Sequence, residues 1–129
     1  MNDPLPIEIR GFIAQQIESL AQLEALLMMR RESERKWIAV ELARQLYLPE
    51  EMCNNMLQEL ERRRFVIRDP DDGAFRYACL DAKVDDLLGR LAILYAERRV
   101  AVISEIYSNP VSKVQTFADA FRLRKEDPQ

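Results

Sequence analysis

Three amide side chains on one predicted helix could hydrogen-bond to the edges of DNA bases. Asn54, Asn55 and Gln58 lie in a helical pattern that runs from Pro49 to Arg64, and side chains three or four residues apart share one face of a helix. Asn and Gln can donate and accept hydrogen bonds at once, which suits them to adenine in the major groove. Amides on an exposed helix face are also often only solvated, and both interpretations stay open at this point.

Four arginines near these amides could contact phosphates. Arg62 and Arg63 end the same helix, and Arg68 and Arg76 lie in the segment that follows it. The helix carries four glutamates against three arginines, and the following segment carries three aspartates against two arginines, so the net charge of each is −1. Lys and Arg contacts to phosphates supply most non-specific affinity for DNA. Because both segments are net negative, we expect few such contacts. An acidic surface would equally suit a basic protein partner.

The composition argues against catalysis. The 129 residues include no histidine, which removes the commonest general base and a common metal ligand. The chain has no glycine-rich phosphate loop, and Cys53 and Cys79 are too far apart for a metal-binding pair, so both are expected to be reduced thiols. We therefore predict that the protein is not an enzyme, and that it has no cofactor and no metal site.

Charge and hydropathy favour a cytoplasmic protein without a membrane partner. The net charge of −3 gives no general attraction to an anionic membrane. The first ten residues lack the basic start and apolar run of a signal peptide. No uncharged apolar stretch reaches the roughly 18 residues that a membrane span needs.

Apolar residues at helical spacing predict a mostly helical chain. Six helices are expected, beginning near residues 7, 19, 39, 49, 81 and 112, and the fifth runs to about residue 107. A single bent helix in place of the first two fits the pattern equally well. Ser19 with Gln22, and Ser112 with Gln115, have the spacing of capping boxes at helix starts. The turn signal DPDDG separates two short strands within residues 65–80. The inward face of the fourth helix is expected to consist of Met52, Cys53, Met56, Leu57 and Leu60.

The order of short helix, turn, helix and two-stranded hairpin is that of a winged helix-turn-helix domain. The stretch WIAVELARQLYLPEEMCNNMLQELERRRFVIRD carries the helices and the first strand of this order, and residues 19–80 as a whole resemble the winged-helix domains of MarR-like bacterial transcriptional regulators. The resemblance implies a mostly α fold with a two-stranded wing and additional N- and C-terminal helices. It also implies a regulator that binds duplex DNA as a dimer.

Two residues depart from the resembled pattern. Arg64 stands where such domains commonly have glycine after the recognition helix. A non-glycine residue in left-handed geometry costs about 1 kcal/mol, so the helix exit is expected to differ. Ile38 stands where Thr or Ser commonly caps the preceding helix, and it cannot complete a capping box with Glu41.

The chain is expected to be a single domain of residues 1–129, with a winged-helix core at 19–80 and dimerising C-terminal helices at 81–122. The long helix of residues 81–107 is apolar on more than one side, so other helices of this chain or a second copy must cover it. Dimerisation through flanking helices is common among the resembled regulators. The residues predicted at the dimer interface are Leu88, Leu91, Tyr95, Val102, Ile103 and Ile106.

The favoured hypothesis is a winged-helix regulator that binds duplex DNA as a homodimer, with the three amides toward bases and the four arginines toward phosphates. The alternative is a protein–protein interaction module on a winged-helix scaffold that does not bind DNA. A continuous positive surface across the helix and the wing would favour DNA, whereas a negative surface would favour a protein partner.

Overall fold

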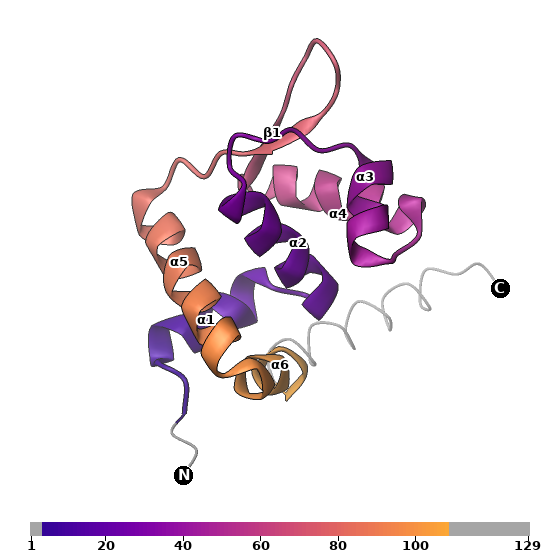
Figure 1. Cartoon of the computed structure of the whole chain (residues 1–129). Helices are drawn as coiled ribbons and strands as arrows, with labels where there is room; N and C mark the ends of the chain where they lie inside the picture. Colours follow the sequence, from indigo (N-terminus) through magenta and orange to yellow (C-terminus); the bar gives the residue numbers. More distant parts are fainter. Residues whose placement is uncertain (1–3, 109–129) are drawn as a thin grey trace, which may run out of the picture.

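The computed structural model describes residues 4–108 of the chain (Figure 1). The described part is mostly helical and has one two-stranded antiparallel sheet, as predicted. The elements in chain order are α1 (Ile7–Gln16), α2 (Leu20–Arg31), α3 (Ala39–Leu46), α4 (Glu50–Arg62), β1 (Val66–Arg68), β2 (Phe75–Tyr77), α5 (Ala82–Glu97) and α6 (Arg99–Ser108). The predicted helix at residues 112–121 lies outside the described residues.

The elements form two groups, distinguished by their contacts. In the first, α3 packs against α4, α4 contacts β1, and α2 contacts both α3 and β2. We call these five elements the winged-helix unit. In the second, α1 contacts α5 and α6, which also pack against each other, and we call these three helices the helical frame. Figure 1 shows the loop between β1 and β2 projecting beyond the helices of both groups.

The two predicted helix starts near α2 and α3 differ in how they are capped. The Ser19 hydroxyl accepts a hydrogen bond from the Gln22 backbone N–H at 3.1 Å. The Gln22 side-chain oxygen accepts in turn from the Glu18 N–H at 2.5 Å, one residue earlier than in a standard capping box. At α3, the Glu41 carboxylate accepts from the Ile38 N–H at 3.4 Å. Ile38 returns no bond because its side chain has no polar atom.

α4 is fixed to the core by one apolar face. Cys53, Leu57 and Leu60 are fully buried, as their spacing predicted. Met56 is half-buried, and Met52 is 42 % exposed. The prediction that Met52 points inward is therefore wrong. Adjacent helical residues point about 100° apart. Met52 is therefore turned away from the centre of the buried face, where its neighbour Cys53 lies.

α4 ends in left-handed geometry even though no glycine is present. Arg64 has φ of 68°, its N–H donates to the Glu61 carbonyl at 2.9 Å, and the Phe65 N–H donates to the Leu60 carbonyl at 3.0 Å. These two bonds form a Schellman motif, in which a left-handed residue follows the helix. The expectation of a different exit is wrong, because the backbone bonds and the buried Phe65 hold Arg64 in this geometry.

The hairpin is joined to the segment before α3. β1 and β2 pair with Val66 opposite Tyr77 and Arg68 opposite Phe75. The Trp37 N–H donates to the Phe75 carbonyl at 2.7 Å, and the Phe75 N–H donates back at 2.8 Å. Trp37 is fully buried, so it is a core residue that anchors the base of the hairpin.

The single long helix predicted over residues 81–107 is wrong, because the chain breaks it into α5 and α6. Arg98 leaves helical geometry, with φ of −132° and ψ of 56°, and α6 begins at the next residue. The break allows α6 to fold against α5, so that Val102 and Ile106 are buried in the core. No glycine or proline marks the break, and the apolar spacing continues across it. A periodic pattern therefore could not indicate it.

Candidate nucleic-acid interface

The solvent-facing side of α4 presents the three predicted amides. Asn54, Asn55 and Gln58 are all exposed, and at about 100° per residue they point into one sector of the helix. We call this sector the reading face. The side chains of the three residues form no hydrogen bond within the described part of the chain. Their donors and acceptors are thus free to meet the edges of bases.

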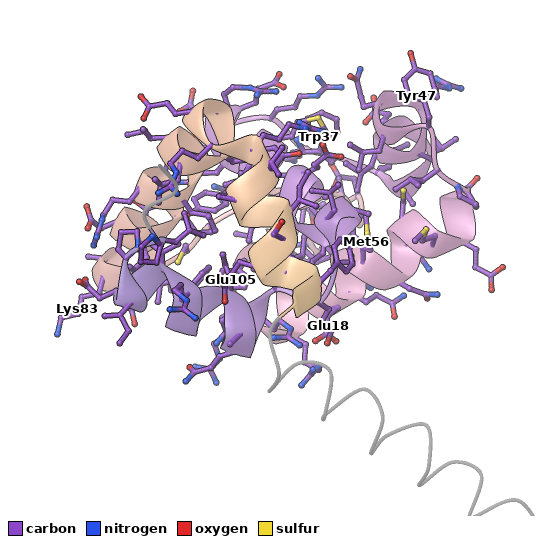
Figure 2. The ribbon with its side chains drawn as sticks, turned by 90° about the horizontal axis from the view of Figure 1, so that it is seen from below. Glu18, Trp37, Tyr47, Met56, Lys83 and Glu105 are labelled. Atoms are coloured by element: carbon purple, nitrogen blue, oxygen red, sulfur yellow. The ribbon has the colours of Figure 1, made fainter. Side chains whose placement is uncertain are left out.

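Tyr47 is a further candidate contact that the sequence analysis missed. It lies in the turn between α3 and α4, is 94 % exposed, and has φ of 57°. Figure 2 shows its side chain pointing away from the helices. A tyrosine hydroxyl can donate to a phosphate oxygen, and this one lies just before α4. The sequence placed it only in a turn, where exposure could not be judged.

Two of the three aspartates in the hairpin turn are already bonded to other groups of the protein. Lys36 forms ion pairs with Asp69 at 2.5 Å and with Asp72 at 3.2 Å. The other oxygens of these carboxylates accept backbone N–H groups of Asp71 and Ala74 at 2.8 and 3.0 Å. The hydrogen bond from Lys36 holds the pKa of Asp69 below its ordinary value. Two wing aspartates therefore shape the turn, and Lys36 offsets part of their charge.

Arg62 lies at the end of α4, where it is largely exposed. Its guanidinium donates twice to the Glu59 carboxylate, at 3.0 and 2.6 Å, and its side chain is 70 % exposed. The hydrogen bond from Arg62, together with Arg63, holds the pKa of Glu59 below its ordinary value. Such an exposed pair is weak, so a phosphate could compete with Glu59 for Arg62.

Arg63 does not belong to the predicted phosphate-binding group. Its side chain is only 16 % exposed, and it points toward the junction of α1 and α2, where it contacts Gln15, Gln16 and Glu18. The prediction assumed that consecutive arginines at a helix end both reach solvent. The structure instead turns this one inward, because acceptors from another part of the chain surround it.

The remaining predicted arginines differ in their surroundings. Arg68 pairs with Glu61 at 3.4 Å and lies over the Phe75 ring, 4.7 Å from its centre. Arg76 is half-buried, and no ion pair to it occurs within residues 4–108. The sequence analysis did not select Arg44 and Arg64, which are exposed and likewise form no ion pair within that range. Three arginines of α3, the hairpin and the exit of α4 are thus without an ion pair in the described residues: Arg44, Arg64 and Arg76.

Most of the residues predicted at the dimer interface are buried inside the single chain. Leu88, Leu91, Val102 and Ile106 are between 0 and 3 % exposed, so a second copy could not reach them, and this part of the prediction is corrected. The reason is that α1 covers α5 and α6.

Two ion pairs hold that cover in place: Arg10 pairs with Glu105 at 3.3 Å, and Arg90 with Glu8 at 3.1 Å. α1 is thus fastened to both C-terminal helices of the frame.

Two of the predicted interface residues retain partial exposure. Tyr95 and Ile103 are half-buried. The Tyr95 hydroxyl donates to Glu24 at 2.8 Å, and burial with this bond raises the pKa of Tyr95 to about 12. The large apolar side chains that the frame leaves exposed are instead Ile7, Ile93, Val100 and Tyr107.

A charged cluster joins the hairpin to the helical frame. Asp85 of α5 accepts hydrogen bonds from the Tyr77 hydroxyl and from the Arg30 guanidinium, the second at 3.1 Å. The bond from Tyr77, and then that from Arg30, holds the pKa of Asp85 below its ordinary value of 3.8. Arg30 also lies over Gly89, where an added Cβ would come within 2.9 Å of its guanidinium. The orientation of β2 is thus tied to α5.

The lowered pKa of Asp85 predicts how stability depends on pH. A carboxyl group whose pKa is lower in the folded state stabilises the fold above its unfolded pKa, and loses this contribution as pH falls through the folded value. The free energy of unfolding should therefore decrease from about pH 5 to about pH 3, and less steeply in Asp85→Asn. Asp86→Asn, which changes an exposed neighbour, is the control. Equal slopes in all three proteins, measured by urea denaturation, would show that the cluster contributes nothing.

The cysteines and acidic groups form no candidate metal-binding centre in the described range. Cys53 and Cys79 are both free thiols, and burial raises the pKa of each. Across residues 4–108, no group of three or more acidic or cysteine side chains could hold a metal ion. Over the same range, no helix is both long and apolar enough to cross a membrane.

Comparison with known proteins identifies the fold. No family model and no curated protein matches the chain. Among solved structures, the chain is similar to MepR, a transcription regulator of the Staphylococcus aureus multidrug efflux pump MepA. The sequence identity is 15 % and the TM-score 0.51, over 92 % of this chain and 89 % of that one. It is also similar to the adhesin competence repressor AdcR from Streptococcus pyogenes, at 13 % identity and a TM-score of 0.46, over 91 % and 89 %.

The likeness to MepR confirms the predicted fold, a winged helix with additional helices on either side of it. Because the match covers 92 % of the chain, it includes the helical frame as well as the winged-helix unit. The predicted resemblance, which rested on residues 19–80, therefore extends to the flanking helices.

Proposed function

We propose that the protein is a transcription regulator that binds duplex DNA as a homodimer. The observation that carries the proposal is the reading face, on which Asn54, Asn55 and Gln58 are exposed and without partners in the described part of the chain. An α-helix fits the major groove, and these side chains suit adenine there. The winged-helix fold and the hairpin that projects beyond the helices support the same conclusion (Figure 1).

The arginines around the reading face would contact the sugar–phosphate backbone. Arg62 would exchange Glu59 for a phosphate, and Arg68 and Arg76 of the hairpin would contact the backbone on the flank. Such contacts set the register of a protein on DNA without reading its sequence. In this division of work, the amides provide specificity and the arginines provide general affinity.

This division can be tested by removing two of the cations. The double variant Arg62→Ala and Arg76→Ala should bind every duplex more weakly than the wild type, with a salt slope shallower by about one for each phosphate that the variant no longer neutralises. Lys83→Ala is the matched control, because Lys83 lies on α5, on the opposite side of the molecule from Tyr47 (Figure 2). Fluorescence anisotropy at several salt concentrations measures both quantities. Equal weakening by Lys83→Ala would mean that DNA binds elsewhere.

A homodimer would present two reading faces to successive turns of the duplex. Two-fold dimers are the commonest oligomers, and the helical frame exposes apolar side chains that a second copy could cover. Ile93 is 59 % exposed, Val100 77 % and Tyr107 51 %. Tyr95 and Ile103, the two half-buried residues among those predicted from the sequence, complete this proposed interface.

Charge on the exposed apolar residues should separate the dimer without unfolding the protein. Ile93→Glu and Val100→Glu should each sediment as folded monomers, because both side chains already face solvent in the single chain. Gln45→Glu, on the exposed side of α3, should remain dimeric. Analytical ultracentrifugation and circular dichroism measure assembly and folding. A wild-type protein that stays monomeric at high concentration would contradict the dimer.

A second candidate function is the binding of a basic protein partner through the same surface. The observation in its favour is that Arg62 and Arg68 pair with glutamates of α4, while Glu50 and Glu51 are exposed in its first turn. This surface would then be acidic in character and poorly suited to phosphates. Failure of the wild-type protein to bind any duplex at low salt would favour this candidate.

A further inference from the structure

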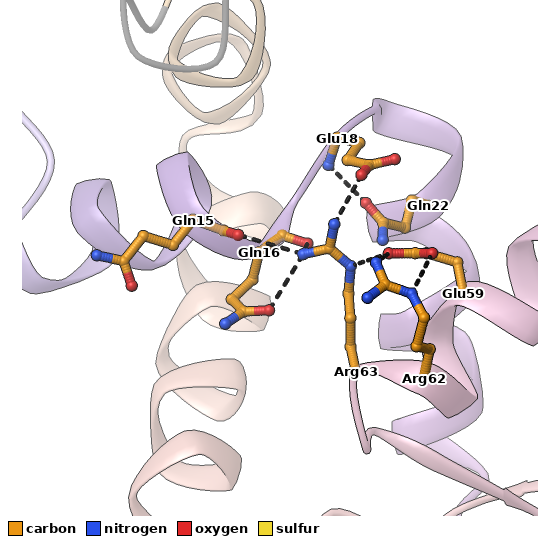
Figure 3. A network of polar contacts seen from close by, with 7 residues as sticks. All are labelled: Gln15, Gln16, Glu18, Gln22, Glu59, Arg62 and Arg63. Atoms are coloured by element: carbon orange, nitrogen blue, oxygen red, sulfur yellow. Dashed lines mark hydrogen bonds and ion pairs between the residues drawn. The ribbon is translucent and has the colours of Figure 1, made fainter. Parts of the chain in front are cut away.

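We infer that Arg63 is a positioning residue that sets the angle between the reading helix α4 and the helical frame. The inference rests on the proposed function, because the angle matters only if the reading face must fit a groove. Arg63 is the residue directly after α4. Figure 3 shows its guanidinium at the centre of a polar network to which α1, the α1–α2 junction, α2 and α4 all contribute.

On the side of α4, the network is fixed by Glu59. The Arg63 Nε donates to the Glu59 carboxylate at 2.5 Å, and both residues lie within the last turn of the helix or directly after it. This bond spans a single turn, so it orients the guanidinium relative to α4 itself. The remaining donors then point away from α4 toward the helical frame (Figure 3).

On the side of α1, Arg63 satisfies the end of the helix. Its Nη1 donates to the backbone carbonyls of Gln15 and Gln16 and to the Gln16 side-chain oxygen, all at 3.2 Å. The last carbonyls of a helix have no partner inside the helix, and cations near them are favourable. α1 has no basic residue in its own last turn, so Arg63 supplies this cation from a distant part of the chain.

A third set of contacts links Arg63 to the start of α2. The Arg63 Nη2 pairs with Glu18 at 2.6 Å, and the Glu18 N–H donates to Gln22 at 2.5 Å. Gln22 is 3 % exposed and lies in the first turn of α2. The single guanidinium thus joins the ends of three helices, two of which belong to the winged-helix unit and one to the helical frame.

The burial of Arg63 makes the network specific for one arrangement. Its side chain is 16 % exposed, whereas that of Arg62 is 70 % exposed. Withdrawing a guanidinium from water is costly unless its donors are satisfied in good geometry. Rotation of α4 against α1 would break several of these bonds together. Phe12 of α1 meets Phe65 beside the network, with ring centres 6.1 Å apart, and this apolar contact has no comparable directional requirement.

A small change in this angle would matter at the reading face. α4 has 13 residues and is therefore about 20 Å long, so a tilt of about 10° about its C-terminal end moves its other end by about 3 Å. Asn54, Asn55 and Gln58 lie four to eight residues before Arg62, the last residue of α4, so the same tilt would move them by about 1–2 Å. A displacement of that size is enough to break hydrogen bonds to base edges, which require donor–acceptor distances of about 2.7–3.2 Å.

The experiment compares Arg63→Gln with Arg62→Gln, a matched loss of charge at the neighbouring position. Residual dipolar couplings of backbone amides measure the angle between α1 and α4 without DNA. Fluorescence anisotropy measures affinity for the duplex that the wild type prefers and for a scrambled one, at several salt concentrations. In Arg63→Gln we expect a changed or averaged angle, discrimination reduced by tenfold or more, and an unchanged salt slope. Arg62→Gln should keep the angle and the discrimination and should lower the salt slope.

Arg63→Lys separates positioning from phosphate binding. Lysine keeps the charge but lacks the planar fork that satisfies several acceptors together, so it should fail to restore the angle or the discrimination. Full rescue by lysine, or a lowered salt slope in Arg63→Gln, would show a phosphate contact and overturn the inference. An unchanged angle in Arg63→Gln would also overturn it.

Two further outcomes keep the inference separate from the proposed function and from a folding defect. If the wild type binds no duplex, the proposed function fails, while the dipolar couplings still decide whether Arg63 sets the angle. If Arg63→Gln does not fold, Glu18→Gln removes the ion pair between Arg63 and Glu18 without changing any residue of α4. Glu18→Gln should then change or average the angle between α1 and α4 relative to the wild type, and an unchanged angle would overturn the inference.

Discussion

Leu57→Ala and Leu60→Ala should each lower the free energy of unfolding by about 2–5 kcal/mol. Both side chains are fully buried, and they attach α4 to the core from the side opposite the reading face. Truncation removes apolar contacts and leaves a cavity that the surrounding helices can close only in part. Urea denaturation followed by the fluorescence of Trp37, the single buried tryptophan, measures the loss.

Met52→Ala is the matched control for these two variants. Met52 lies on the same helix but is 42 % exposed, so its truncation should cost less than about 1 kcal/mol. Losses below about 0.5 kcal/mol at both Leu57 and Leu60 would mean that α4 has a different rotation about its axis. The amides assigned to the reading face would then not share one exposed sector.

Asn55→Ala should change which sequences the protein prefers, while leaving its affinity for non-specific duplexes nearly unchanged. A bidentate pair between an amide and adenine contributes about 1–3 kcal/mol of discrimination, or roughly fivefold to more than a hundredfold in relative affinity. Asn55 is exposed and its side chain has no partner in the described part of the chain. Its removal should therefore not disturb the fold.

Selection from random duplexes, carried out in parallel for the wild type and Asn55→Ala, measures the change in preference. The control is Gln45→Ala, which replaces an exposed amide on α3. A preference that is the same in all three proteins would show that Asn55 reads no base. A uniform loss of affinity across all sequences would instead place Asn55 on the phosphate backbone.

Local patterns in the sequence were sufficient to predict α4 and the hairpin. The burial of Leu57 and Leu60 follows from helical spacing, and the cap at Ser19 follows from residues three positions apart. The turn at residues 69–73 has a strong local signal. In each of these cases, the interaction that decides the structure lies within a few residues along the chain.

Several of the incorrect or missed features depend on interactions between distant parts of the chain, whereas the break at Arg98 is local but unmarked. Arg63 and its acceptors Gln15 and Gln16 are separated by 48 and 47 residues, and nothing near Arg63 in the sequence indicates that it turns inward. The burial of Leu88 depends on coverage by α1, and the break at Arg98 has no glycine or proline to mark it. Lys36 and the wing aspartates are likewise 33 and 36 residues apart.

The change in the role of Arg63 alters the expected salt dependence. With Arg63 inside the protein, three of the four predicted phosphate contacts remain in each chain, those of Arg62, Arg68 and Arg76. Through these contacts a dimer would neutralise at most about six phosphates, which corresponds to a slope of log affinity against log salt no steeper than about −5. A protein with this slope depends more on base contacts than one that carries a strongly basic surface.

Selection of the wild-type protein on random duplexes at two salt concentrations tests DNA binding most directly. We predict that duplexes are bound at low salt, that one adenine-containing sequence is enriched, and that its affinity falls with salt at a slope no steeper than about −5. Enrichment should persist at the higher salt, because base contacts release no counterions. Absence of binding to any duplex at low salt, or binding that enriches no sequence, would contradict the assignment of α4 as a reader of DNA.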